Sequence, residues 1–429
     1  MAAAAFGLGL GGTLGLAVTE ETRRAIAAPG GLFIAVGRVA GLSGAYLLLV
    51  MVLLMARIPA LERAVGQDRL ARWHRRIGPW PVVLIALHVV FITLGYARSA
   101  SVGVLHQAWT FLDSYPDVLA ATVAFALLVM VSVVSVRIAR RRLRYETWWA
   151  VHLYVYLALA LAFAHQIVTG AAFVGHPLQR IVWSVAWAGT AGVAIVFRLG
   201  LPLWRSARHQ LRVVVVRREG PDVVSIVCSG RHLEHLNFTG GQFFQWRFLT
   251  KGLWWQAHPY SLSALPSPPY LRLTVRARGD HGRNLASIMP GTRVAIEGPY
   301  GAFTSEHRHT ERVLLVGAGV GVTPLRAILE DLPDDVDATV IVRASSHADL
   351  VLREELIALL KARAGRLYEV VGSRDTVTFD VRMLRKLVPD VSARDVYVCG
   401  PDGFSQGLIS AVRRLGVPEQ RIHRESFAF

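Results

Sequence analysis

The chain has 429 residues, of which 53% are hydrophobic, and a formal net charge of +17. Its mean hydropathy of +0.40 is high for a soluble protein, and its length leaves room for two or three domains. Its only cysteines, Cys228 and Cys399, are too few to ligate an iron–sulfur cluster and give no disulfide framework.

Long apolar stretches are concentrated in the first half of the chain. Five of them cover residues 32–56, 79–97, 117–136, 148–173 and 181–204. Each is long enough to cross the hydrocarbon core of a bilayer as a helix. The shorter Gly-rich stretch Ala2–Val18 is either a sixth span or a signal peptide, and the lack of a Lys/Arg cluster before it favours a span. The pattern predicts a six-helix transmembrane bundle over residues 1–208.

Basic residues alternate between the predicted loops. Six arginines lie in residues 57–76 and five in residues 137–144, whereas the loops at 98–116 and 170–177 hold only Arg98. Because basic loops stay on the cytoplasmic side, the C-terminal half is predicted to lie in the cytoplasm and the chain in the plasma membrane. The charge of +17 is then a topology and anionic-lipid signal that requires no nucleic acid partner.

Two predicted spans each carry a pair of histidines. His74 and His88 are 14 residues apart, and His152 and His165 are 13 apart. At ~1.5 Å of rise per residue these gaps are roughly 20 Å, most of a hydrocarbon core. Since neutral imidazole is an axial ligand of haem iron, we predict two stacked haems. Matching by depth pairs His74 with His152 on the inner haem and His88 with His165 on the outer one.

Each of these histidines also has a plainer interpretation. A buried histidine is commonly a hydrogen-bonded packing residue, and His74, next to Trp73, can instead lie at the membrane interface. Thirteen residues leave the second pair roughly 140° out of phase. The fifth span therefore needs a bulge or twist, or it meets the two haems from different sides.

Arg38 is the remaining charged residue inside a span. It lies in the outer part of the predicted second span. It can neutralise a haem propionate or hold a small anion or an oxygen species beside the outer haem. The alternative is that it reaches the outer headgroups.

The chain changes character near residue 209. Short strands separated by Gly and Pro turns predict a small antiparallel β-barrel over residues 209–306. From Glu311 onward strands and helices alternate, which predicts a doubly wound α/β nucleotide-binding domain over residues 307–429.

Three motifs suggest the chemistry of this half. In the run 258–263, His-Pro-Tyr-Ser-Leu-Ser, an aromatic ring can lie against a flavin while a hydroxyl reaches the ring edge. The runs 276–279 and 282–285 offer arginines and glycine-exposed amides to a pyrophosphate, unless they form a solvated turn. In 317–324, Gly-Ala-Gly-Val-Gly-Val-Thr-Pro, the glycines let a dinucleotide phosphate approach a helix N-terminus, although the spacing departs from the Rossmann fingerprint.

The order of these motifs resembles the ferredoxin–NADP reductase flavoprotein module. It includes Glu297-Gly298-Pro299-Tyr300-Gly301, Val398-Cys399-Gly400-Pro401 and a terminal aromatic residue, Phe429. Together with the histidine pairs, the module resembles the ferric reductase and NADPH oxidase superfamily over nearly the whole chain. The resemblance implies NADPH, FAD and two b-type haems acting in series.

The resemblance also assigns residues to each cofactor. Pro259, Tyr260 and Ser261, flanked by His258 and Ser263, would contact the flavin. The FAD phosphates would meet Arg276, Arg278, Arg283 and Asn284. The NADPH site would comprise Gly317, Gly319, Gly321, Thr323, Pro324, Gly400 and Pro401.

Four further residues receive roles. Cys399 would lie by the nicotinamide, although an inert buried thiol is its commoner fate. Phe429 would cover the flavin until nicotinamide displaces it. Arg343 with Ser345 could grip a 2′-phosphate and favour NADPH over NADH, unless Arg343 forms a surface salt bridge.

The implied function is transfer of electrons from cytoplasmic NADPH through FAD and both haems to an outer acceptor. Short outer loops favour O2, which would yield superoxide. The alternatives are a ferric chelate, or an electron-donor subunit serving a partner protein or a quinone, although nothing in the sequence requires a protein partner. Arg38, Cys399 and Phe429 are the predicted catalytic residues, and oligomeric state and regulation are left open.

Overall fold

The computed structural model describes residues 2–17, 22, 26–143, 145–277, 279–373 and 380–425. It divides into two compact units. Unit 1 comprises Met1–Ile58 and Asp68–Arg198, and unit 2 comprises Pro59–Gln67 and Leu199–Phe429. The predicted domains 209–306 and 307–429 therefore belong to one compact body.

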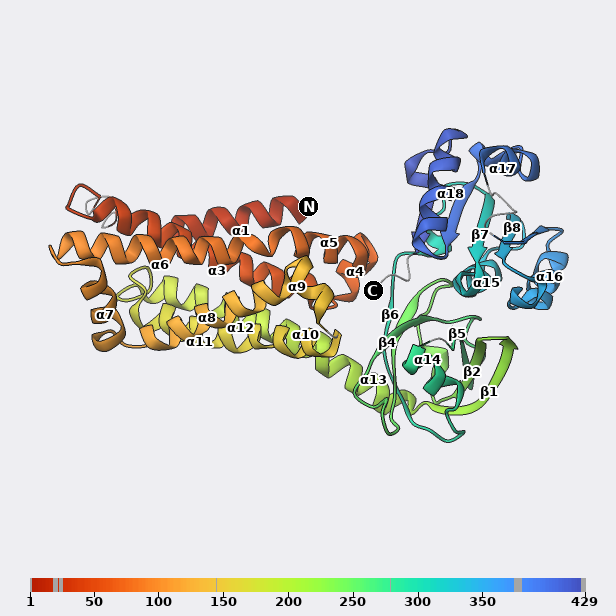
Figure 1. Ribbon diagram of the computed structural model, residues 1–429, viewed down its shortest axis with the longest axis horizontal. Helices are drawn as coiled ribbons and strands as arrows, with labels where there is room; N and C mark the ends of the chain where they lie inside the picture. Colours follow the sequence, from red (N-terminus) through yellow and green to blue (C-terminus); the bar gives the residue numbers. More distant parts are fainter. Residues whose placement is uncertain are drawn as a thin grey trace. The chain divides into compact units, whose positions relative to one another are not determined.

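Unit 1 is helical. Its longer helices run alongside one another in Figure 1, and α7 runs across them at one end. The helices are α1 (Ala2–Ala17), α3 (Gly31–Met55), α5 (Gln67–Ile77), α6 (Pro79–Ser99), α7 (Val104–Ser114), α8 (Val118–Ser135), α9 (Arg137–Arg142), α10 (Tyr145–His152), α11 (Tyr154–Thr169) and α12 (Pro177–Ile195). Helix α7 lies in a stretch that the sequence suggested was a short loop.

Five helices within the described residues are long and apolar enough to cross a membrane. They are Gly31–Met55, Arg69–Ser99, Val118–Ser135, Thr147–Thr169 and Pro177–His209. The apolar part of α1, Phe6–Ala17, is shorter than these five. Five spans therefore match the prediction, and α1 is a shorter apolar helix.

Glycines bring α3 and α6 into close contact. A Cβ atom at Gly37 would lie 2.9 Å from Ile92, one at Gly41 2.6 Å from Nδ1 of His88, and one at Gly44 2.9 Å from Ile85. Small residues spaced along one face let helix backbones approach in a membrane, where packing replaces the hydrophobic effect as the driving force.

The span Thr147–Thr169, which carries His152 and His165, is interrupted beside its first histidine. Helix α10 ends at His152, Leu153 forms a turn, and α11 begins at Tyr154. The amide of Tyr156 donates to the carbonyl of Leu153 at 3.1 Å, an i to i+3 bond that tightens the helix there. The change in winding lies between His152 and His165, whose helical phases the sequence could not reconcile.

Unit 2 begins its sheets with six antiparallel strands. One sheet has the order β1 (Arg212–Gly220), β2 (Val223–Ser229), β5 (Tyr270–Arg276), and the other β4 (His258–Ser261), β3 (Phe243–Phe248), β6 (Val294–Tyr300). The isolated bridges Arg212–Arg293 and Leu262–Leu273 link them, so the described ladders are two three-stranded sheets and not one continuous barrel. Trp246, Phe244 and Ile226 pack in the core between them.

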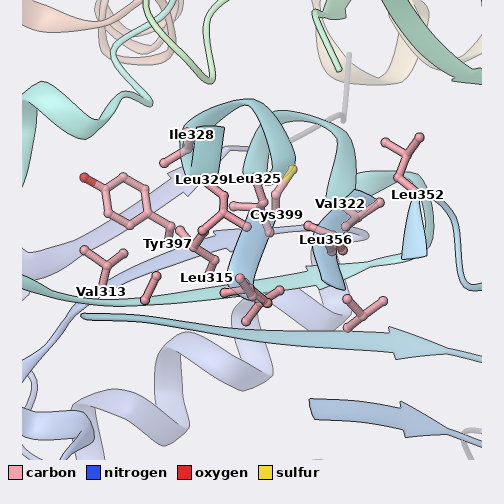
Figure 2. Packing of buried hydrophobic residues seen from close by; sticks show 14 of the residues in the cluster. Val313, Leu315, Val322, Leu325, Ile328, Leu329, Leu352, Leu356, Tyr397 and Cys399 are labelled. Carbon is pink, nitrogen blue, oxygen red and sulfur yellow. The ribbon is translucent and has the colours of Figure 1, made fainter. Parts of the chain in front are cut away.

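The remaining strands form a parallel sheet (Figure 1). Its order is β11 (Ile422–Glu425), β10 (Asp395–Cys399), β7 (Arg312–Ala318), β8 (Asp337–Ala344), β9 (Arg366–Val371). The helices of unit 2 are α4 (Pro59–Val65), α13 (Leu201–His209), α14 (Gly279–Ala286), α15 (Val322–Asp331), α16 (Arg353–Ala362), α17 (Val381–Leu387) and α18 (Asp402–Arg414). Two apolar clusters bury opposite faces of the sheet, as expected for a doubly wound fold, and Figure 2 shows the one that packs against α15.

Candidate cofactor sites

The structure brings His74 and His152 together in unit 1. Their ring centres are 6.2 Å apart with an interplanar angle of 60°. With a metal–nitrogen bond of about 2.0 Å and a nitrogen about 1.1 Å from its ring centre, imidazoles on opposite sides of one metal ion have ring centres roughly 6 Å apart. The spacing of this pair therefore fits two axial ligands of one iron.

Polar neighbours orient His152. Its Nδ1 atom lies 3.5 Å from the hydroxyl of Ser135, and that hydroxyl accepts a hydrogen bond of 3.2 Å from the indole of Trp148. The rings of Trp148 and His152 are also in contact, with centres 5.1 Å apart. The imidazole is thus held by its Nδ1 side.

His88 is held in the same manner by α3. Its Nδ1 atom lies 2.8 Å from the carbonyl oxygen of Gly37, and its ring packs against Gly41. A carbonyl only accepts, so Nδ1 carries the proton and Nε2 keeps its lone pair. Such a bond fixes the tautomer that a metal ligand needs.

His165 has an equivalent arrangement with Thr169. The hydroxyl of Thr169 donates to the carbonyl of His165 at 2.8 Å and lies 2.8 Å from Nδ1 of the same residue. Because the hydroxyl proton is used by the carbonyl, Nδ1 must donate to the hydroxyl oxygen. This again leaves Nε2 free to bind a metal.

His88 and His165 line one cavity of about 420 Å³ within unit 1. Arg38 also lines it, and its guanidinium donates to the hydroxyl of Thr22 at 3.4 Å. Most of the remaining lining is apolar. The structure therefore gathers the predicted outer pair and Arg38 around one space whose size is usual for a bound cofactor.

The His-Pro-Tyr-Ser run forms β4, an edge strand of its sheet. The indole of Trp246 donates to the carbonyl of Tyr260 at 3.0 Å, and burial raises the pKa of the Tyr260 phenol well above its ordinary value. His258, Pro259 and Tyr260 are half-buried, whereas Ser261 is buried. The strand thus offers a partly accessible aromatic face beside a fixed backbone.

Ser263 has a different environment. It is completely buried, and its hydroxyl accepts hydrogen bonds from Thr274 at 2.8 Å and from Arg272 at 3.0 Å. These hydrogen bonds tie the segment after β4 to β5, and the side chain of Ser263 is not exposed to a ligand.

The predicted pyrophosphate residues lie around β5 and α14. Arg276 is partly exposed and bonds Asp222 at 3.1 Å, and Arg283 and Asn284 are exposed on α14. A Cβ atom at Gly282 would lie 2.8 Å from the carbonyl of Arg276, so the helix packs closely on the strand. Arg278 and Phe429 lie outside the described residues.

The glycine loop joins β7 to α15. A Cβ atom at Gly321 would lie 2.4 Å from the carbonyl oxygen of Cys399, so only glycine fits there. Gly319 has a φ of +55° and open space beside it, and Gly317 packs against Leu325. Thr323, whose hydroxyl donates to Val320 at 2.9 Å, is buried with Pro324 in the first turn of α15. The loop therefore presents backbone at a helix N-terminus, an arrangement that suits a phosphate.

Gly400 and Pro401 lie beside this loop, at the carboxyl end of β10. Cys399 pairs with Gly317 across the strands. Its side chain is completely buried among apolar residues of the core in Figure 2, and burial raises the pKa of its thiol well above the ordinary value. The structure thus favours the inert buried thiol over a thiol that contacts nicotinamide.

Arg343 lies at the end of β8, next to the glycine loop. Its guanidinium donates to the carbonyls of Gly372 at 2.8 Å, of Val370 at 3.3 Å and of Ser373 at 3.0 Å, and also to that of Ala344. Ser345 is exposed. A 2′-phosphate would therefore have to share or replace the hydrogen bonds between Arg343 and the end of β9. The partners of the Arg343 guanidinium are backbone carbonyls, and not the carboxylate of a surface salt bridge.

Several supporting residues were missed from sequence. Thr169 and the glycines of α3 orient the histidines, and Arg272 links β5 to α16. Arg272 makes bonds of 2.6 and 2.7 Å to the two carboxylate oxygens of Glu355, and Arg326 also contacts Glu355 at 2.8 Å. Thr169, one helical turn after His165, could have been recognised from the sequence as a partner of that histidine. The other partners are distant in sequence.

Family models match the chain in three consecutive segments. Residues 40–163 match a ferric reductase like transmembrane component, residues 208–304 an FAD-binding domain, and residues 315–409 an oxidoreductase NAD-binding domain. Taken together, these three matches are the domain set of the ferric reductase and NADPH oxidase superfamily. The chain is a membrane protein with several apolar helices followed by FAD- and NAD-binding domains.

Curated relatives fall into two kinds. The chain is 28% identical to an NADPH oxidoreductase of Mycobacterium tuberculosis, over 54% of this chain and 63% of that protein. It is 27% identical to dual oxidase 1 of Rattus norvegicus, over 73% of this chain and 21% of that protein. The chain thus spans about three fifths of the first relative's length and about a fifth of the second's.

Among solved structures, one similar chain is the flavohaem-like FAD/NAD-binding domain of nitric oxide dioxygenase from Vibrio cholerae O1 biovar El Tor. It covers 51% of this chain and 98% of its own length, with 24% identity and a TM-score of 0.44.

Proposed function

We propose that the chain is a plasma-membrane NAD(P)H oxidoreductase that passes electrons from cytoplasmic NADPH through FAD and two b-type haems to an outer acceptor, most readily O2. The observation that carries this proposal is the pair of imidazole sites in unit 1, in a chain whose remaining half matches FAD- and NAD-binding domains.

The haem proposal rests on two pairs of imidazoles. His74 and His152 have the ring spacing of two axial ligands, and His88 and His165 each keep Nε2 free because Nδ1 is bonded. These residues fit the group that the superfamily implies. When bound, FAD supplies hydride acceptance with one-electron release, and haem supplies one-electron transport.

The chain's own residues position the donor. The carboxyl ends of β7 and β10 meet at Gly317 and Cys399, and the glycine loop exposes backbone amides there. Ligands of doubly wound sheets bind at the carboxyl ends of strands. We assign this edge to the nicotinamide dinucleotide and β4, with Tyr260, to the flavin.

NADPH is proposed over NADH because one curated relative is named an NADPH oxidoreductase. Arg343 gives this preference only modest support, since its guanidinium is bonded to backbone carbonyls. Both nucleotides therefore belong in the test.

O2 is proposed over a ferric chelate because of the cavity beside His88 and His165. Its lining is largely apolar, with Arg38 as a cation, which suits a small neutral acceptor better than a charged chelate. The similarity to a dual oxidase points the same way. His88 and His165 would hold the outer haem beside this cavity, and the haem would supply single electrons to the acceptor.

The deciding experiment is an anaerobic optical titration of purified, FAD-supplemented protein with NADPH and, separately, NADH. We expect haem absorption bands in the purified protein, and we expect NADPH to reduce the haem. Air or a ferric chelate is then admitted in parallel. Fast reoxidation by air with superoxide formation identifies an oxidase, and fast reoxidation by the chelate with slow reaction in air identifies a ferric reductase.

A matched pair of variants tests the ligands. His165→Gln should lose haem and the reduction of the outer acceptor while the flavin is still reduced. His106→Gln, at an exposed histidine on α7, should behave as the wild type. An absence of haem from the wild type, or equal haem content in both variants and the wild type, would overturn the proposal. Slow reaction with both acceptors would instead support a subunit that serves a partner protein or a quinone.

A further inference from the structure

Two histidines and an aspartate meet near the amino ends of the parallel strands, at the end of the sheet opposite to the glycine loop. His309 precedes β7, Asp395 begins β10 and His423 lies in β11, paired with Tyr397. One donor atom from each lies within 4.8 Å of the other two. At ~3.3 Å per residue, the four residues from Asp395 to Cys399 put this cluster roughly 13 Å from the nucleotide edge.

The two oxygens of Asp395 have separate tasks. Oδ2 accepts hydrogen bonds from the amides of His309 at 2.9 Å and Thr310 at 2.7 Å and from the Thr310 hydroxyl at 2.9 Å. Oδ1 faces the imidazoles, 2.9 Å from Nε2 of His423 and 3.5 Å from Nδ1 of His309. The carboxylate is completely buried. Three donors hold one of its oxygens, and the other oxygen points at two nitrogen atoms.

The imidazole of His423 is also held in place. It stacks on Tyr397 with ring centres 4.3 Å apart, and the phenol of Tyr397 donates to the carbonyl of Thr304 at 3.0 Å. The His309 ring lies parallel to that of His423, with centres 6.3 Å apart, and is half exposed. Ligands whose rotamers are fixed by packing lose little entropy when they bind a metal.

We propose that His309, Asp395 and His423 form a binding site for a divalent cation of the zinc class. Two imidazoles and a carboxylate are ligands that zinc accepts, and water from the exposed side can complete four-fold coordination. In a tetrahedral site with bonds of about 2.0–2.2 Å, donor atoms are about 3.4 Å apart. The two distances to Oδ1 of Asp395, 2.9 and 3.5 Å, bracket this value, and the two imidazole nitrogens lie within 4.8 Å of each other, so a metal would replace the proton between His423 and Asp395.

The ion would fasten the last strand to the sheet. β11 has only four residues and pairs with β10 along one edge. A metal bridge from His423 to Asp395 and His309 would tie β11 to β10 and to the segment before β7. The site is therefore structural and does not depend on the proposed function.

The test is equilibrium dialysis of the EDTA-treated, detergent-solubilised full chain against Zn²⁺, with metal measured per chain. We expect one tightly bound equivalent, and His309→Gln and His423→Gln should each weaken binding by at least about tenfold. The His309→Gln variant keeps the backbone amide that donates to Asp395. His307→Gln, at an exposed histidine two residues away, should bind as the wild type.

Hydrogen exchange of Ile422–Glu425 locates the ion. Zn²⁺ should slow exchange of this strand in the wild type and in His307→Gln but leave it unchanged in His309→Gln. Equal affinities of wild type and His309→Gln would overturn the proposal, because the metal would then lie elsewhere, for example at His232, Glu234 and His235. Unchanged exchange in β11 on adding Zn²⁺ would overturn it as well.

Discussion

Thr169 fixes the orientation of His165 through a single hydroxyl group. Replacing it by valine keeps the shape and removes the acceptor of the Nδ1 proton. If His165 ligates haem, Thr169→Val should release haem at least about tenfold more readily, the usual scale for lost outer-shell partners of a metal ligand. Transfer of haem to a scavenging protein measures this.

Thr110→Val is the matched control. Thr110 makes the same bond to the carbonyl four residues earlier, at 3.0 Å, but is exposed on α7. Equal haem loss in the two variants would mean that the effect comes from the helix and not from the imidazole.

The two cysteines are expected to be unreactive in the native chain. Cys228 and Cys399 are completely buried, and burial raises the pKa of the Cys228 thiol to about 12 and that of Cys399 well above its ordinary value. Both are therefore protonated at pH 8. A chromogenic thiol reagent should detect no thiols in the native protein and two in denaturant. Rapid modification of a thiol in the native chain, with loss of NADPH oxidation, would contradict this prediction and indicate that Cys399 lies at the nicotinamide site.

Residue identities were predictable where the signal was local. Four histidines at paired spacings were sufficient to predict His74 beside His152, because helical spans fix depth. The true surroundings of Ser263 and Arg343 were not, since Arg272 and the carbonyl of Gly372 reach them from other strands. Tertiary partners of this kind leave no mark on a sequence motif.

At the scale of elements, the sequence predicted short strands over residues 209–306 and alternating strands and helices from Glu311 onward, and unit 2 has its elements in this order. The polar side chains of β11, Ile-His-Arg-Glu, give no apolar alternation by which a strand is predicted. The interruption at Leu153 was foreseen only as a phase conflict between two histidines.

Arg272 links β5 to α16, and its effect should depend on pH. Burial raises the pKa of the Glu355 carboxyl, but hydrogen bonds and charge from Arg272, with Arg326, outweigh burial and leave it below the ordinary 4.5. A carboxyl with a lowered folded pKa stabilises the fold above its unfolded pKa, and this stability is lost as the pH falls through the folded value. Arg272→Met should therefore cost unit 2 about 1–2 kcal/mol at pH 7, since both side chains are partly exposed.

Pulse proteolysis in urea measures this difference. The gap between wild type and Arg272→Met should narrow as the pH falls below 4.5. Arg353→Met, at an exposed arginine of the same helix whose partners are Glu354 and, on β9, Glu369, should change little at either pH. A gap that is independent of pH would assign the loss to packing of the arginine stem.

For the whole molecule, the distribution of arginines predicts which face of the membrane each segment occupies. The buried native thiols make the chain a suitable background for single introduced cysteines. Ser101, in the turn between α6 and α7, and Ser287, just after α14, are both exposed. The basic stretches 57–76 and 137–144 should stay cytoplasmic, as should unit 2, which puts Ser101 outside.

A membrane-impermeant maleimide should therefore label Ser101→Cys in intact cells and Ser287→Cys only after lysis. The wild-type chain, labelled in neither state, reports the background. Labelling of Ser287→Cys in intact cells would contradict the proposed direction of electron flow. The nucleotide-binding end of the sheet would then lie outside the cell, where metabolism does not supply NADPH. Protection of Ser101→Cys in intact cells with labelling after lysis would put the turn before α7 on the cytoplasmic side. With unit 2 also cytoplasmic, this outcome would require an even number of spans between the turn and unit 2, in place of the three expected.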